Sequence, residues 1–208
     1  MPRIQAVVFD YGDVLSGPRD PVLVARLRHL TGLPDDTFRR AYAHNRLRLD
    51  RLTMTAPAYW AEILSHGHVP PTDGLIRELI QADVACCVRL DPAMTAWVER
   101  LKTAGIRCAI LSNMPRELLA GLRRAHAGWL ALFESTVFSC EAGCVKPEPL
   151  IYRRMLETLG LDATEILFID DVERNLVVAE QLGFETLLYR GVDELRATLT
   201  DRLDLPLP

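Results

Sequence analysis

Short apolar runs recur along the chain, and each has the length of a single buried strand. They cover residues 4–9, 106–111, 135–139, 166–169 and 186–189. Segments whose apolar residues repeat at helical spacing separate the later runs and cover residues 92–103, 116–125, 149–159 and 173–182. Gly105, Gly160 and Gly183 follow three of these segments, where we expect left-handed helix C-caps. The alternation predicts an α/β fold with a doubly wound, Rossmann-like parallel sheet that carries helices on both faces.

The stretch from residue 17 to 86 breaks this alternation. Helical spacing recurs there at 21–30, 34–47, 56–65 and 73–84, with no convincing strand between these segments. The simplest interpretation is a small helical bundle inserted after the first strand. We therefore predict an α/β core made of residues 1–16 and 87–208, and a helical cap made of residues 17–86. Such a cap is expected to fold over the carboxyl ends of the strands, where ligands bind in open α/β sheets.

Polar residues stand at the ends of three apolar runs. Asp10 follows the first run, Ser112 and Asn113 end the second, and Asp170 and Asp171 end a later one. A carboxylate at the mouth of a buried strand costs free energy unless it is paired, coordinated or used for chemistry. The carboxyl ends of parallel strands share one edge of the sheet, so these side chains are expected to converge.

A loop lysine, Lys146, joins this set between the second and the last of these strand ends. Each member has a simpler explanation when it is taken alone. Ser112 with Asn113, or Asp170 with Asp171, could cap the helix that follows, and Lys146 could be a solvated charge. These simpler explanations would all have to hold in one ordered chain, so the sequence favours a shared site.

In this order the polar residues resemble those of the haloacid dehalogenase-like hydrolase superfamily, whose members are mostly magnesium-dependent phosphatases. The residues that carry the resemblance, which spans nearly the whole chain, are Asp10, Ser112, Lys146, Asp170, Asp171 and Asn175. The branch with small helical caps, which includes sugar-phosphate phosphatases, is the most similar one. This resemblance also implies a mobile cap over the active site.

The resemblance implies a phosphatase that forms an aspartyl-phosphate at Asp10. A carboxylate nucleophile divides phosphoryl transfer into two steps, and cations are needed because attacker and phosphate are both anionic. Lys146 would supply one positive charge and take part in both catalysis and phosphate binding. The Ser112 hydroxyl and a backbone N–H, that of Asn113, would bind phosphate oxygens.

The second cation implied by the resemblance is Mg²⁺. Its ligands would be the carboxylates of Asp10 and Asp171 and the carbonyl of Gly12, since this ion prefers hard oxygen ligands. Asp170 and Asn175 would support these ligands from behind, unless Asp170 binds the ion through a water molecule.

The chain departs from the family pattern at Gly12. Most phosphatases of this family carry a second aspartate there, which protonates the leaving group and later activates water. Asp13 is adjacent, but its side chain should project in another direction, so it is an uncertain substitute. Esters whose leaving groups need little protonation, such as aryl, acyl and anomeric sugar phosphates, would tolerate this gap best.

Two other functions stay open. A 2-haloacid dehalogenase attacks carbon with its aspartate, needs no metal and likewise lacks the second aspartate, but it has no use for the carboxylate of Asp171. A non-catalytic phosphate-binding member of the family is the other alternative. In the cap, polar and aromatic residues could face the site and select the substrate, or they could pack the bundle. These are Tyr42, His44, Asn45, Arg46, Arg48, Tyr59 and Trp60.

Composition and net charge limit the number of domains and the kinds of partner that the protein can have. The 208 residues suit one domain with a modest insertion, and 49% hydrophobic content excludes a wholly disordered chain. A net charge of −4 gives no reason to expect nucleic acid or an anionic membrane as a partner. We expect a cytoplasmic monomer or homodimer without a signal peptide, acting on a small phosphorylated metabolite. The five cysteines should be reduced, since Cys140 and Cys144 lack a second ligand pair for zinc.

Overall fold

The computed structural model describes residues 4–202 and 205–208, and its centre is a five-stranded sheet. The strands are β1 (Ala6–Phe9), β2 (Arg107–Ser112), β3 (Ser135–Phe138), β4 (Ile166–Asp170) and β5 (Glu185–Leu188). Their spatial order is β3-β2-β1-β4-β5, and each neighbouring pair is parallel. The five apolar runs are therefore the five strands, as predicted.

Strand β1 occupies the middle of the sheet, and Phe9 at its end pairs with Ile110 of β2 and Ile169 of β4. The chain passes outward from β1 through β2 to β3, and then returns to the other side of β1 for β4 and β5. The strand order thus reverses direction at β1. A crevice outside the carboxyl ends at such a switch point is the usual ligand site of an open α/β sheet.

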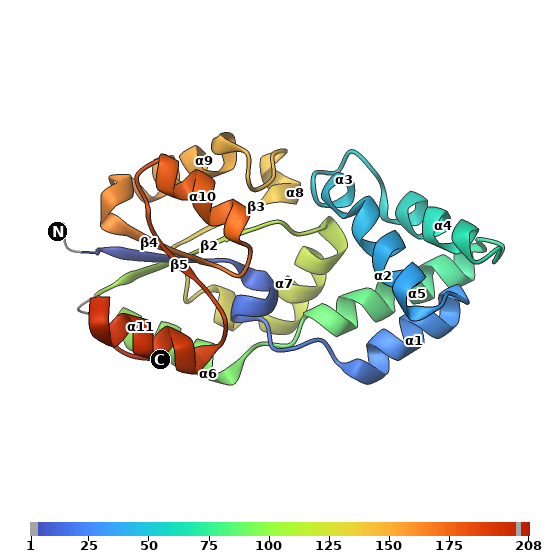
Figure 1. The fold of residues 1–208 in the computed structure, drawn as a ribbon, viewed down its shortest axis with the longest axis horizontal. Coiled ribbons are helices and arrows are strands. Elements are labelled where there is room, and N and C mark those ends of the chain that lie inside the picture. Colours follow the sequence, from blue (N-terminus) through green and yellow to red (C-terminus); the bar gives the residue numbers. More distant parts are fainter. Residues whose placement is uncertain (1–3, 203–204) are drawn as a thin grey trace.

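Helices cover both faces of the sheet, which confirms the doubly wound core (Figure 1). Val7 and Phe9 of β1 point into one apolar layer, and Ala6 and Val8 point into the other. The first layer contains α6 (Pro92–Thr103), α7 (Arg116–Leu130) and α11 (Val192–Arg202), and the second contains α9 (Pro149–Leu159) and α10 (Glu173–Gln181). This alternation arises because successive strand residues face opposite sides.

Several helix bounds differ from those expected. Helix α7 runs five residues beyond the predicted end at 125, to Leu130, across a non-helical residue, His126. The imidazole Nε2 of His126 lies 2.8 Å from the carbonyl oxygen of Val88, so a tertiary contact accompanies the kink. The sequence did not predict α11, the short α8 (Ser139–Ala142) or the helical turn η2 (Ala163–Glu165). Gly105, Gly160 and Gly183 have φ values of 81°, 63° and 95°, as expected after helix ends.

The inserted segment forms a separate helical bundle with its own apolar core. Its helices are α1 (Pro21–Thr31), α2 (Asp35–His44), α3 (Arg46–Asp50), α4 (Ala56–His66) and α5 (Asp73–Cys87). Leu27, Phe38, Trp60 and Leu79 belong to that core. The prediction of one helix over 34–47 was wrong, because the backbone leaves helical geometry at Asn45. The buried amide of Asn45 instead donates a hydrogen bond of 2.5 Å to Glu62 Oε1 of α4.

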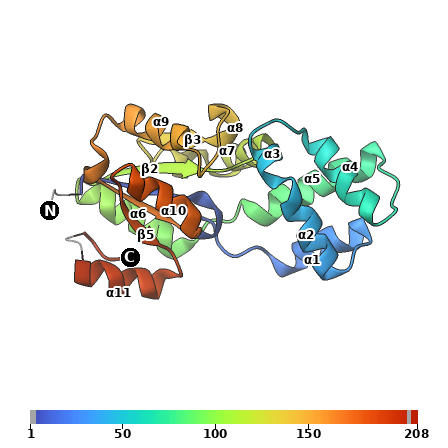
Figure 2. The same cartoon turned by 45° about the horizontal axis from the view of Figure 1, so that its top comes forward.

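The bundle lies beyond the carboxyl ends of the strands, at the end of the sheet opposite the start of β1 (Figures 1 and 2). The two segments that connect it to the sheet run side by side, joined by an antiparallel bridge between Ser16 and Leu90. The division into residues 1–16, 17–86 and 87–208 stays a prediction, and α5 extends to Cys87. Within residues 4–202 and 205–208, no helix combines the length and apolar character needed to cross a membrane.

Candidate active site

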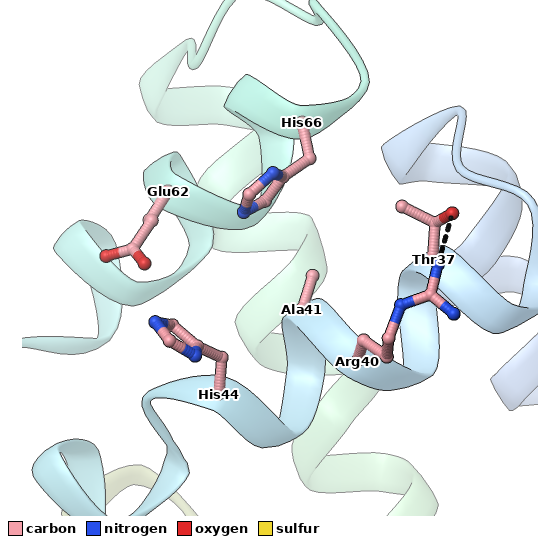
Figure 3. A pocket seen from close by; sticks show the side chains of 6 residues that line it. All are labelled: Thr37, Arg40, Ala41, His44, Glu62 and His66. Carbon is pink, nitrogen blue, oxygen red and sulfur yellow. Dashed lines mark hydrogen bonds between the residues drawn. The ribbon is translucent and has the colours of Figure 1, made fainter.

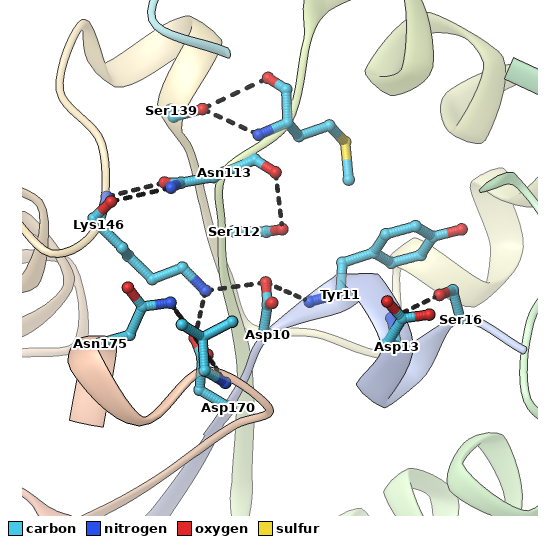
Figure 4. A network of polar contacts seen from close by, with 12 residues as sticks. Asp10, Tyr11, Asp13, Ser16, Ser112, Asn113, Ser139, Lys146, Asp170 and Asn175 are labelled. Atoms are coloured by element: carbon cyan, nitrogen blue, oxygen red, sulfur yellow. Dashed lines mark hydrogen bonds and ion pairs between the residues drawn. The ribbon is translucent and has the colours of Figure 1, made fainter. Parts of the chain in front are cut away.

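Asp10 lies directly after β1, at the switch point of the sheet. Its Oδ1 accepts a hydrogen bond of 2.7 Å from the backbone N–H of Tyr11 and lies 2.9 Å from Nζ of Lys146 (Figure 4). The wide turn η1 (Tyr11–Leu15) follows and is closed by the N–H of Ser16, which donates to the Tyr11 carbonyl at 2.8 Å. Burial raises the pKa of Asp10, the charge of Lys146 opposes this effect, and Asp170 adds to it.

Lys146 is 1% exposed, so it is not a solvated loop charge. Its ammonium group bridges two carboxylates, at 2.9 Å from Asp10 Oδ1 and 2.5 Å from Asp170 Oδ2. Burial alone would lower the pKa of Lys146, but the charges of Asp10 and Asp170 outweigh it and the pKa is raised. Lys146 therefore stays a cation in the middle of the site.

The side chain of Asn113 holds the backbone of the lysine loop. Its Nδ2 donates to the Lys146 carbonyl at 3.0 Å, and its Oδ1 accepts from the Lys146 N–H at 2.7 Å. The sequence predicts that Asn113 binds phosphate through its backbone N–H, and it gives no sign of this side-chain contact. Neither Asn113 nor Ser112 caps α7, whose N-cap is Pro115 and has no side-chain cap bond. The hydroxyl-bearing Ser112 is 1% exposed at the end of β2.

Asp170 is fully buried, and both of its oxygens are occupied. Besides Lys146, it accepts from Asn175 Nδ2 at 3.0 and 3.1 Å and from the N–H of Val172 at 2.8 Å. It does not act as the N-cap of α10, since Val172 occupies that position. Asp170 thus orients Lys146 and the loop that carries the half-buried Asp171.

Asp10, Asp170 and Asp171 each place an oxygen within 4.8 Å of the others. Burial raises the pKa of Asp171 to about 6, and the charges of Asp10, Asp170 and Asp13 add to this rise. The Lys146 ammonium pairs with Asp10 and Asp170 but not with the nearby Asp171, so the three carboxylates carry more negative charge than this ammonium group balances. Clustered carboxylate oxygens with excess negative charge fit a hard divalent cation such as Mg²⁺.

The backbone conformation at Gly12 and Asp13 shows whether position 12 could carry an aspartate and how the Asp13 backbone is held. Gly12 has φ −64° and ψ 128°, a conformation open to any residue, and a Cβ there would meet no atom within 4 Å. Asp13 has a positive φ of 55°, and its N–H donates to Ser16 Oγ at 2.9 Å. Its side chain is exposed.

A cavity of about 190 Å³ lies between this turn and the helical bundle. Tyr11, Gly12 and Asp13 contribute to its wall from the core side. Arg46 and Asp50 come from α3 of the bundle, and Arg19 comes from the segment that leads into α1. The bundle therefore folds over the carboxyl ends of the strands, as expected for a cap. Sequence reasoning missed Arg19 and Asp50, because neither belongs to a motif at a strand end.

Most of the cap residues that the sequence left open between the site and the packing of the bundle lie away from the cavity. Arg46 lines the cavity, whereas His44 lines a separate pocket of about 260 Å³ between α2 and α4 (Figure 3). Tyr59 and Trp60 are each 1% exposed in the core of the bundle, which is the packing role that the sequence left open. The hydroxyl of Tyr42 donates to a carboxylate of the cap, that of Asp83, at 2.6 Å.

The five cysteines carry free thiols. Burial raises the pKa of Cys86 and of Cys108 to about 12, so these thiols are protonated at neutral pH. Cys140 and Cys144, next to the lysine loop, are buried as well, and burial raises the pKa of both.

Comparison with known proteins identifies the family of the chain. The family model for haloacid dehalogenase-like hydrolases matches residues 4–183. The sesquiterpene phosphatase astK of Aspergillus oryzae is 31% identical over 97 residues, which cover 47% of this chain and 49% of that protein. The chain thus spans about half the length of that relative. The phosphatase MT3486 of Mycobacterium tuberculosis is 26% identical over 81% of this chain and 79% of its own.

Among solved structures, the haloacid dehalogenase family enzyme BT-2542 of Bacteroides thetaiotaomicron, in complex with magnesium and inorganic phosphate, has the same fold. The TM-score is 0.72 at 19% identity, and the match covers 90% of this chain and 94% of that one.

Proposed function

Because the chain belongs to the haloacid dehalogenase-like hydrolase family, we propose that this hydrolase is a Mg²⁺-dependent phosphatase that acts on a small phosphomonoester through Asp10. One observation carries this proposal. The buried Nζ of Lys146 lies 2.9 Å from Asp10 Oδ1 and 2.5 Å from Asp170 Oδ2. These two carboxylates stand at the ends of the adjacent strands β1 and β4. A pair of carboxylates that shares a cation at the switch point is the arrangement that an anionic nucleophile and an anionic substrate require.

The reaction begins at Asp10. One carboxylate oxygen attacks phosphorus and forms the aspartyl-phosphate, while the Tyr11 N–H, at 2.7 Å from Oδ1, keeps the carboxylate in position. Lys146 offsets negative charge on the nucleophile and on the transferring group. The hydroxyl of Ser112, at the end of the adjacent strand, binds a phosphate oxygen together with the N–H of Asn113.

The cation completes the charge balance. Asp10, Asp171 and the carbonyl of Gly12 would hold Mg²⁺, with Asp170 and Asn175 fixing the acidic loop from behind. When bound, the ion supplies electrostatic stabilisation of the transferring phosphoryl group and allows Asp10 and Asp171 to be ionised together. Two phosphatases among the relatives, and the fold shared with an enzyme in complex with magnesium and phosphate, support this assignment.

The size of the cavity supports a small substrate. The cavity between turn and cap, which Gly12 and Asn113 line, has a volume of about 190 Å³ and suits a compact ester such as a sugar phosphate. A 2-haloacid dehalogenase is less well supported, because its chemistry leaves the cluster of Asp10, Asp170 and Asp171 unexplained. The cytoplasmic location and the oligomeric state stay predictions.

A substrate screen tests the proposal. Sugar phosphates, nucleotides, acyl phosphates and 4-nitrophenyl phosphate should be assayed with Mg²⁺ and with excess chelator, next to 2-chloropropionate. Phosphate release that depends on Mg²⁺ and disappears in Asp10→Asn is the expected result. Chloride release that persists in chelator, without phosphate release from any ester, would overturn it.

A further inference from the structure

A cap carboxylate, Asp50, borders the same cavity as Gly12, the position where the family's second aspartate is missing. It ends α3 and lines the same cavity as Gly12 and Asp13. Its residue exposure is 4%. Among the described residues, no donor makes a hydrogen bond to its Oδ1; the Nε of Arg46 lies 3.3 Å away without hydrogen-bond geometry. A buried carboxylate oxygen in a cavity wall that has an ion pair but no hydrogen bond is free to accept one from a bound ligand.

The backbone of Asp50 is attached to the core rather than only to the cap. Its carbonyl accepts a hydrogen bond of 2.8 Å from Ser139 Oγ, and the same hydroxyl accepts one of 2.9 Å from the N–H of Met114. The next residue, Arg51, forms an ion pair with Glu148 of the core. These contacts fix the end of α3 against the loops that follow β2 and β3. Asp50 is therefore held at the cavity wall.

We propose that Asp50 supplies, from the cap, the general acid and base that Gly12 does not provide. This inference rests on the proposed phosphatase function. In phosphoryl transfer the attacking and leaving oxygens lie roughly in line. Asp10 attacks from the sheet, so the leaving oxygen departs on the opposite side, toward the cap wall that contains Asp50.

Asp50 would donate a proton when the aspartyl-phosphate forms and accept one when it is hydrolysed. In the first step, Asp10 Oδ attacks phosphorus, the bond from phosphorus to the leaving oxygen breaks, and that oxygen keeps the electron pair and takes the proton of Asp50. In the second, the Asp50 carboxylate takes a proton from water, whose oxygen attacks phosphorus. The bond from phosphorus to Asp10 breaks, phosphate departs, and Asp50 is protonated again for the next cycle.

The charges around Asp50 permit both protonation states. Burial raises its pKa to about 6; Arg46 opposes this rise, and Asp83 and Asp10 add to it. Arg46 does not hold Asp50 ionised by itself, since its Nη1 also lies 3.2 Å from Asp83 Oδ2 and 2.7 Å from the Tyr42 hydroxyl. The other charged or titratable groups that line the cavity are Tyr11, Asp13, Arg19 and Cys87. A group with a pKa near neutrality can both donate and accept a proton.

The experiment compares two leaving groups in the first chemical step. Single-turnover formation of the aspartyl-phosphate is measured with 4-nitrophenyl phosphate and with a simple alkyl phosphate, in wild type and in Asp50→Asn. General acid catalysis is typically worth about 10²-fold or more, so the alkyl ester should slow by that factor. The aryl ester should lose far less, because 4-nitrophenolate leaves without a proton. Equal losses for both esters, or no loss for either, would overturn the role of Asp50.

A control and a rescue separate chemistry from damage to the cap. Asp83→Asn removes the other carboxylate that contacts Arg46. Because Asp83 raises the pKa of Asp50, this variant should shift the fall of the alkyl-to-aryl ratio to lower pH and leave the value of the ratio at low pH unchanged. Gly12→Asp in the Asp50→Asn background places an acid at the family position, where the backbone and the free space allow one. This second substitution should restore the rate with the alkyl ester and change the rate with the aryl ester little. If the double variant is folded and active on the aryl ester but the alkyl-ester rate is not restored, the inference is contradicted.

The pH profile of the wild-type enzyme adds a measurement that needs no variant. The acid must be protonated, so the alkyl-ester rate should fall relative to the aryl-ester rate as pH rises through about 6. Titration of Asp10 and Asp171 affects both esters and cancels in the ratio. A ratio that does not change with pH contradicts the inference. Aspartyl-phosphate formation from the aryl ester tests the proposed function alone, so the two failures are distinguishable.

Discussion

At the scale of single residues, the site is organised by one buried cation. The Lys146 ammonium group sits between Asp10 and Asp170, at 2.9 and 2.5 Å, and the charges of both raise its pKa. Removal of either carboxylate leaves part of that charge uncompensated in a buried environment, which is costly. Conservative substitutions are therefore the informative ones here.

Asp10→Asn tests the nucleophile with little change of shape. An amide cannot form the aspartyl-phosphate, so phosphatase turnover should fall by at least about 10³-fold. The measurement is steady-state phosphate release together with intact mass after mixing with substrate, which should show no added phosphate. Thermal unfolding serves as the control for folding. Turnover close to that of wild type in a folded variant would rule out Asp10 as the nucleophile.

Asp171→Ala tests the metal site. It removes one of the proposed Mg²⁺ ligands, so titration calorimetry should show weakened binding and Mg²⁺ should no longer stimulate activity. Glu173→Ala, two positions along at the exposed start of α10, removes a neighbouring carboxylate and should leave both properties unchanged. Mg²⁺ affinity that is the same in Asp171→Ala and in wild type would place the ion elsewhere.

At the scale of elements, the contact between α5 of the cap and α7 of the core depends on one glycine. A Cβ at Gly121 would lie 2.4 Å from Val84 Cγ1, so the two helices approach closely only because position 121 has no side chain. Gly128, on the same helix, has no atom within 4 Å of its Cβ position. The two glycines of α7 thus differ in packing but share a helix.

This difference predicts opposite effects of the same substitution. Gly121→Ala should destabilise the protein by about 1–3 kcal/mol, since the stiff valine and its helix must shift. Gly128→Ala should be neutral or stabilise by up to about 1 kcal/mol, because alanine has the better helix propensity. Urea unfolding of both variants provides the measurement. Equal effects of the two substitutions would show that α5 adjusts freely against α7.

At the scale of the whole molecule, folding buries acidic groups, so their protonation is linked to stability. The pKa of Asp171 is raised to about 6, above its ordinary value of 3.8. The folded protein therefore binds more protons than the unfolded chain between these pH values. Stability contributed by this group is present below about pH 3.8 and is lost as pH rises through about 6.

Binding of Mg²⁺ should reverse that loss. At pH 7.5 Asp171 is ionised and available as a ligand, whereas at pH 5 protons compete with the ion for it. The increase in melting temperature caused by Mg²⁺ should therefore be clearly larger at pH 7.5 than at pH 5. Differential scanning calorimetry with and without Mg²⁺ at both pH values measures this, with Asp171→Ala as the control. A shift of equal size at both pH values would contradict the proposed ligand set.

The sequence by itself determined the sheet and the strand-end residues. Apolar runs of strand length separated by helical periodicity leave little choice of fold, because each element has to bury its apolar face. Once the strands are parallel, their carboxyl ends share an edge. Asp10, Ser112 and Asp170 consequently had to converge there. The sequence alone also shows that Gly12 stands where most phosphatases of this family carry a second aspartate.

Only the tertiary structure decided which side chains complete the site. Asn113 binds the backbone of Lys146, 33 positions away, and Asp50 reaches the cavity because Ser139, 89 positions away, holds its carbonyl. Such contacts leave no periodic signal, since they depend on how the cap lies on the core. His44 appears equally suited in the sequence, yet the packing of α2 against α4 directs it into another pocket. Local patterns determine the elements, and the packing of distant segments determines what faces the cavity.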